Sequence, residues 1–90
     1  MSRFIGLHTL PGFTREMLER TTPALEQVQD ARFVRAYSSF NDGKVVCEFE
    51  APDKATLAQV YGTLGFPYDQ IVEVEAICDA GEEGVRTRFL

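Results

Sequence analysis

The sequence lacks tryptophan and is poor in the side chains that most often bind metals or attack substrates. It has one histidine, His8, and two cysteines, Cys47 and Cys78, which lie 31 positions apart. This composition excludes the HExxH helix, the zinc-finger spacings and the CxxC redox motif. The sequence also has no GxSxG turn and no glycine-rich phosphate loop. We expect both cysteines to be buried, reduced thiols.

Positive charge is scarce as well. Nine Lys and Arg residues stand against fourteen Asp and Glu residues, which gives a net charge of −5. Because nucleic acids and anionic membranes attract basic surfaces, we expect neither of them as a partner. No apolar run approaches the roughly 18 residues of a membrane span, and the first residues do not resemble a signal peptide. We therefore predict a cytoplasmic protein.

The hydrophobic periodicity predicts four strands and two helices. Thr14 and Asp53 are the expected N-caps of the helices. Pro23 interrupts the first helical pattern, so we expect a kink or a break there, with Thr22 capping the second half. Gly65 is placed to end the second helix in the left-handed conformation. The strands are predicted at residues 4–10, 32–40, 44–50 and 71–77.

The order βαββαβ within 90 residues predicts one α+β domain, a ferredoxin-like sandwich. Its four-stranded antiparallel sheet should carry both helices on one face, with the first and third strands in the centre. We place this domain at residues 1–78 and treat residues 79–90 as a C-terminal tail. The end of the tail alternates weakly, which predicts either a short extra strand or an arm that reaches a partner chain.

Strand alternation then sorts the side chains between the two faces of the sheet. We assign Ile5 and Leu7 to the face beneath the helices, and His8 to the opposite, uncovered face together with Phe4 and Phe33. Because exposed apolar area is unfavourable, we expect a homodimer in which a second copy covers this face. The alternative is a monomer with a half-polar sheet, which antiparallel sheets allow.

The uncovered face also predicts a binding site around His8. Cross-strand neighbours lie about 5 Å apart at Cβ, so carboxylates there could orient the imidazole ring. The alternative is that His8 is a structural residue and that the glutamates form a solvated or interface surface. The predicted ligand-binding residues, on the sheet face or in a helix–sheet cleft, are His8, Arg35, Tyr37, Glu48, Glu50 and Glu73.

Three segments together resemble a known family. They are the first strand with His8 and its following Pro-Gly, residues 43–52 (GKVVCEFEAP), and residues 65–71 (GFPYDQI). Over about residues 3–77 the chain resembles a nickel-binding-protein-like bacterial domain of unknown function, a ferredoxin-like dimer. The resemblance implies dimerisation and binding of nickel or zinc. In that family histidines occupy the positions of Tyr61 and Phe66, which leaves His8 and Glu50 as the implied metal ligands.

Three functional hypotheses follow, in order of preference. The first is a small dimeric protein that binds a small-molecule ligand around His8. The second is a weak nickel- or zinc-binding protein that uses His8 and Glu50. The third is a cofactor-independent oxygenase or isomerase, which rests on analogy between folds. The residues by themselves specify no cofactor.

Overall fold

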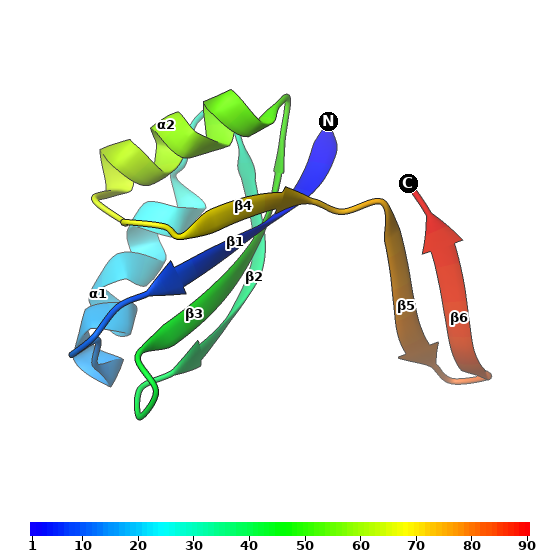
Figure 1. Ribbon diagram of the computed structural model, residues 1–90, viewed down its shortest axis with the longest axis horizontal. Helices are drawn as coiled ribbons and strands as arrows, with labels where there is room; N and C mark the ends of the chain where they lie inside the picture. Colours follow the sequence, from blue (N-terminus) through cyan, green and yellow to red (C-terminus); the bar gives the residue numbers. More distant parts are fainter.

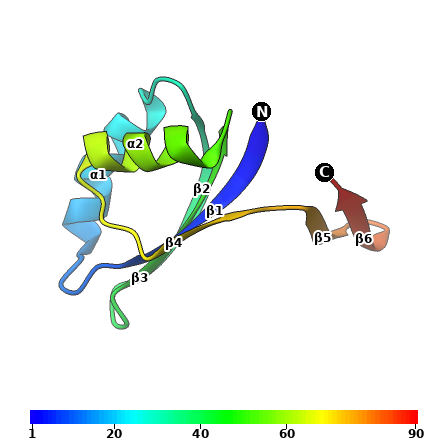
Figure 2. The ribbon, with the colours of Figure 1, turned by 45° about the horizontal axis from the view of Figure 1, so that its top comes forward.

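The computed structural model describes residues 1–90 and contains two helices and two antiparallel sheets. Strands β1 to β4 form one sheet in the order β2-β3-β1-β4, so β1 and β3 are central, as predicted. Both helices lie on one side of this sheet (Figure 1, Figure 2). The chain is therefore α+β, in an arrangement compatible with the ferredoxin-like sandwich. The elements are β1 (Ser2–Thr9), α1 (Arg15–Glu26), β2 (Arg32–Ser39), β3 (Lys44–Ala51), α2 (Lys54–Leu64), β4 (Gln70–Glu73), β5 (Ala76–Gly81) and β6 (Gly84–Phe89).

The helix boundaries follow the predicted caps. The side chains of Thr14 and Asp53 accept hydrogen bonds from backbone N–H groups in the first turns of α1 and α2. Gly65 ends α2 with a φ of 73°, a left-handed conformation that suits glycine. The predicted break at Pro23 is wrong, because α1 runs through it to Glu26. Leu25, beyond the proline, is buried in the core and holds the last turn in place.

The core lies between β3 and the helices. The alternate β3 side chains Val45, Cys47, Phe49 and Ala51 are all buried, and Phe49 packs edge-on against Tyr61 of α2. These residues point as predicted, because β3 has an apolar set on one side and a mostly charged set, with Val46, on the other. We call the opposite side of the four-stranded sheet, which no helix covers, the open face.

The predicted orientation of β1 is wrong. Directly opposed residues of an antiparallel pair share a face, so the buried residues of β3 determine which side each β1 residue takes. Ile5 and Leu7 therefore lie on the open face. The pairs on the helix side are Phe4–Phe49, Gly6–Cys47 and His8–Val45.

Phe33 also lies on the side opposite to the one predicted. The pairing of β2 with β3 shifts between Phe33 and Arg35, which is the signature of a β-bulge. The extra residue turns Phe33 toward the helices, where it packs against Phe49 with ring centroids 5.3 Å apart. Arg35, beyond the bulge, remains on the open face, as predicted.

The last predicted strand is divided in two. β4 ends at Glu73, and β5 begins at Ala76 in a separate two-stranded sheet with β6. This hairpin, which with Leu90 we call the arm (residues 76–90), projects away from the rest of the protein (Figure 1). Cys78 lies in it and is exposed, so only Cys47 fulfils the expectation of a buried thiol. Neither helix has the length and apolar character needed to cross a membrane.

Candidate functional site

His8 lies on the central strand β1, beneath α2 and only 2% exposed. Its Nδ1 is 2.8 Å from the carbonyl oxygen of Pro67, which follows α2. A carbonyl only accepts hydrogen bonds, so Nδ1 carries the proton and donates it. In the neutral imidazole, Nε2 is then a bare acceptor. The ring packs edge-on against Tyr61, with centroids 4.7 Å apart.

Two buried polar atoms near His8 have no hydrogen-bond partner. They are Nε2 of His8 itself and the hydroxyl oxygen of Tyr61. Both lie over Gly6, because a Cβ at that glycine would be 2.1 Å from the Tyr61 hydroxyl and 3.0 Å from His8 Nε2. Buried polar atoms normally have partners, so these two are a candidate for function.

Cys47 completes this group, since it is the β3 partner of Gly6. Burial raises the pKa of the Cys47 thiol to about 11, so the sulfur keeps its proton near neutral pH. Burial also raises the pKa of Tyr61, and the neighbouring Cys47 adds to the effect. The cluster of His8, Cys47 and Tyr61 therefore carries no ionised thiol or phenol near neutral pH, and two of its polar atoms have no partner.

Two adjoining hollows, which together we call the cleft, lie beside this cluster. The outer part has a volume of about 320 Å³ and lies between α1 and the segment 65–67. The inner part has a volume of about 20 Å³ and is lined by His8 and Cys47, among others. A space of that size holds about one water molecule. Four residues line both parts, namely Leu10, Phe13, Thr21 and Phe66.

The other residues of the predicted site do not meet His8. Glu48 and Glu50 lie on the open face, where arginines hold both carboxylates. Arg3 spans them at 3.0 Å and 2.8 Å, and Arg35 is 3.3 Å from Glu48. Hydrogen bonds from Arg32 and Arg3 lower the pKa of Glu50. The predicted cluster of His8 with these carboxylates is therefore wrong, because the sheet separates them.

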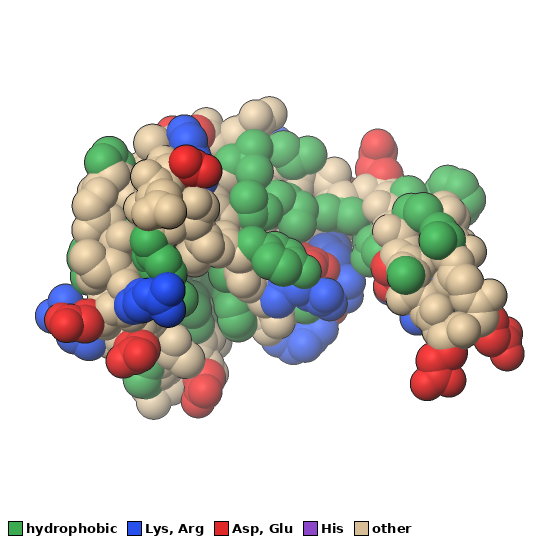
Figure 3. Space-filling model, turned by 90° about the horizontal axis from the view of Figure 1, so that it is seen from below, with side chains coloured by type: hydrophobic (Ala, Val, Ile, Leu, Met, Phe, Trp, Pro, Cys, Tyr) green, Lys and Arg blue, Asp and Glu red, His purple; other side chains and the backbone are tan.

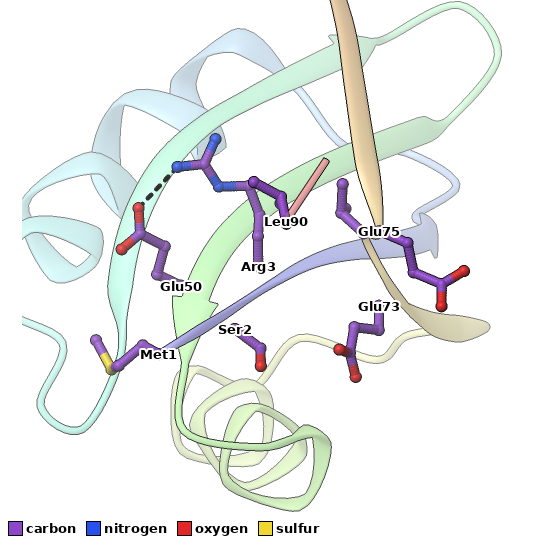
Figure 4. Close-up of a pocket in the computed structure, with 8 residues that line it drawn as sticks. Met1, Ser2, Arg3, Glu50, Glu73, Glu75 and Leu90 are labelled. Atoms are coloured by element: carbon purple, nitrogen blue, oxygen red, sulfur yellow. Dashed lines mark hydrogen bonds and ion pairs between the residues drawn. The ribbon is translucent and has the colours of Figure 1, made fainter. Parts of the chain in front are cut away.

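The other two predicted residues are also remote from the imidazole. Tyr37 lies on the open face and is 66% exposed. Glu73 lies at the exposed end of β4 and lines a shallow pocket of about 350 Å³ beside the arm. Figure 4 shows Glu73 on the far side of Arg3 from Glu50. Arg3 is a residue that the sequence reasoning missed. It belongs to the same alternate set of β1 as Ile5 and Leu7, so its charge was a signal that this set lies on the open face.

The side chains present do not fit a nickel or zinc centre. No three His, Cys, Asp or Glu residues come together where they could hold a metal ion. The predicted ligand pair of His8 and Glu50 is wrong, because the two lie on opposite faces of the sheet. Cys47 shares the face of His8, but its raised pKa disfavours the thiolate that binds metals.

Comparison with known proteins places the chain in a family. Residues 4–74 match the family described as nickel responsive protein SCO4226-like. The chain belongs to the SCO4226-like family. It is also similar to the crystal structure of SCO4226 from Streptomyces coelicolor A3(2), with a TM-score of 0.71 and 25% sequence identity. That alignment covers 81% of this chain and 95% of the other. A comparison with curated proteins found no match.

The resemblance inferred from the sequence is thus confirmed at the level of the family. The matched SCO4226-like region contains β1 to β4 with both helices, and therefore His8 and its cleft. It ends at residue 74, so the arm lies outside it. The residues that line the cleft therefore lie within the family match, and the arm lies outside it.

Proposed function

We propose that this protein binds a small, mostly apolar ligand that carries one hydrogen-bond donor. The ligand occupies the cleft between α1 and the segment 65–67, and its donor binds Nε2 of His8. The observation that carries the proposal is this buried acceptor without a partner, on a residue that lines the inner part of the cleft. An unpaired buried acceptor costs about 1–3 kcal/mol, which a donor on the ligand would recover.

The size and lining of the cleft support this ligand class. Its outer volume of about 320 Å³ lies at the lower end of the range for small-molecule sites. None of the residues that line the two parts is an Asp, Glu, Lys or Arg, so an ionic ligand would have no counter-charge. Phe66 lines both parts, and its rotation would let the donor reach His8. The proposed ligand is therefore neutral.

Indole and indene form a matched pair of probes, since they have the same size and only indole has an N–H group. We expect indole to bind about fivefold more tightly, which corresponds to one hydrogen bond of about 1 kcal/mol. Titration of isotope-labelled protein, followed by amide chemical shifts, measures both affinities and locates the site. In His8→Phe, which keeps a ring but loses the acceptor, the preference for indole should disappear.

Two outcomes would contradict the proposal. One is the absence of shifts at cleft residues with either probe, and the other is an indole preference that survives His8→Phe. Phe66→Ala is the second variant, because it opens the passage without touching the acceptor. It should tighten binding of both probes, and the indole preference should remain. Circular dichroism of each variant confirms that the fold is intact.

Nickel binding is a second candidate, and only the family description favours it. Against it stand the single imidazole, the protonated thiol of Cys47 and the separation of His8 from Glu50. We expect calorimetry with nickel chloride to detect no saturable binding below millimolar metal. Saturable binding that is lost in His8→Phe would favour a metal site instead.

An oxygenase or isomerase would also need substrate beside His8. The inner cavity of about 20 Å³ is too small for an organic substrate. Opening at Phe66 would be required before any reaction, and the lining supplies no charged residue to stabilise a charged intermediate. Binding is therefore the function that the geometry supports best.

A further inference from the structure

A further pocket lies in the helical layer, between α2 and the C-terminal end of α1 with the loop of residues 27–30. We call it the helix pocket. Its volume is about 460 Å³, within the range of about 300–1,000 Å³ for small-molecule sites. None of the residues that line it also lines the cleft beside His8. The helix pocket is therefore a separate site.

The helix pocket combines apolar side chains with a polar rim. Val60 of α2 is buried, and Val28 and Leu64 are half-buried beside it. The uncharged polar residues of the lining are three glutamines and two threonines, namely Gln27, Gln29, Gln59, Thr56 and Thr63. Apolar walls with a few polar groups are typical of sites for small organic molecules.

Asp30 is the only charged residue that lines the helix pocket. Its carboxylate is not part of any ion pair in the chain. Asp30 is also the only residue other than glycine with a positive φ, which is 68°. Aspartate and asparagine adopt this left-handed conformation more readily than most residues. The turn therefore places an unpaired negative charge at the pocket.

The helix ends add to this negative potential. Neither helix has a basic residue in its last turn, and residues of both last turns line the helix pocket. The C-terminal end of a helix carries partial negative charge and favours cations. At the start of α2, the carboxylate of Asp53 accepts a 2.7 Å hydrogen bond from the N–H of Thr56 and so offsets the positive end of that helix.

The basic residues of the chain lie elsewhere. Four of the nine are on the open face, namely Arg3, Arg32, Arg35 and Lys44. Seen from below, basic side chains gather on the body close to the arm (Figure 3). The helices contain only Arg15, Arg20 and Lys54, and none of these lines the helix pocket. A cation in the pocket would therefore meet negative charge without a competing positive group.

We propose that the helix pocket binds a small amine with an apolar body. The ammonium group lies beside Asp30 and the end of α1, where the negative potential is concentrated. The apolar body packs on Val28, Val60 and Leu64. A carboxylate or phosphate ligand would find no counter-charge in the lining, so the pocket selects against anions.

Cyclohexylamine and cyclohexanol are matched probes, because they have nearly the same size and only the amine is charged near neutral pH. Titration of the full isotope-labelled chain, followed by amide chemical shifts, measures both affinities and locates the site. We expect the amine to bind about fivefold more tightly than the alcohol, with shifts at residues 27–30 and along α2. The ratio of the two affinities should fall toward one at about 1 M salt, which screens exposed charges.

Three variants test the role of charge. Asp30→Asn removes the carboxylate and keeps a residue that tolerates the left-handed backbone, so the affinity ratio should fall to about twofold. Glu26→Gln is the matched control, because it removes a nearby carboxylate that does not line the helix pocket. It should leave the ratio within about 1.5-fold of the parent value. Thr63→Lys places an ammonium group at an exposed position of the lining and should abolish the preference for the amine.

Three outcomes would overturn the proposal. They are the absence of shifts at the helix pocket with either probe, equal affinities for the amine and the alcohol, and an affinity ratio that is unchanged in Asp30→Asn. Circular dichroism of each variant confirms that the fold is intact, so a lost preference can be assigned to the lost charge.

Discussion

Replacing Gly6 by alanine tests the arrangement of β1 beneath α2. The added Cβ would lie 2.1 Å from the hydroxyl oxygen and 2.7 Å from Cζ of Tyr61. Tyr61 is fully buried, so its ring cannot rotate into solvent. Overpacking of a core typically costs 1–3 kcal/mol. Because the overlap here is severe, we expect Gly6→Ala to destabilise the protein by about 3 kcal/mol.

Urea unfolding followed by circular dichroism measures this change. In thermal unfolding, the same loss of about 3 kcal/mol should lower the melting temperature by about 12–24 °C for a domain of this size. Gly62→Ala is the matched control, because a Cβ there meets no atom within 4 Å. It lies inside α2, so alanine should stabilise the protein by about 0.5–1 kcal/mol.

A second substitution attributes the effect to the tyrosine. In the background of Gly6→Ala, Tyr61→Phe removes the closest atom and leaves Cζ at 2.7 Å. We expect it to restore about 1 kcal/mol. Equal stability of Gly6→Ala and the parent protein would refute the reasoning, because Tyr61 and His8 could not then lie over this glycine.

Two further predictions concern pH and helix capping. The pKa of Cys47 is about 11 in the folded protein against 9.0 for the free side chain, so between these values only the unfolded chain loses the proton. The contribution of Cys47 to the free energy of unfolding is present below pH 9 and should fall by about 2 kcal/mol at pH 11. Urea titrations should show that Cys47→Ala loses less stability than the parent protein as the pH rises from 9 to 11. An equal loss in the two proteins would contradict the assignment. Asp53→Ala should cost about 1 kcal/mol, because the carboxylate accepts a 2.7 Å hydrogen bond from the N–H of Thr56. Asp53→Asn should retain most of that stability, and a loss as large as with alanine would count against a capping role.

Local signals in the sequence were sufficient to predict the capping residues of the helices. Thr14, Asp53 and Gly65 act within one turn of their own positions, so their roles depend on few distant contacts. Pro23 is the exception, since its local preference for a break is overcome by the burial of Leu25 in the core.

The bulge in β2 and the division of the last strand were not visible in the same way. A bulge changes the pairing by one residue, and nothing near Phe33 marks it before β3 is in place. The alternation continues through residues 71–77, so it does not mark the break between β4 and β5. The break arises because β5 pairs with β6 in a separate sheet. Both features arise from strand partners rather than from the residues themselves.

The sequence by itself determined the order of the elements as far as β4, the central strands and the family, because periodicity, caps and short motifs are local. Only the tertiary structure decided which side of the sheet His8 occupies. Both sets of alternate residues in β1 are apolar enough for a core, so alternation distinguishes two faces without saying which is buried. Pairing with Val45, Cys47 and Phe49 decides it. Gly6 then provides the space for Tyr61, and the imidazole lies beneath the helix.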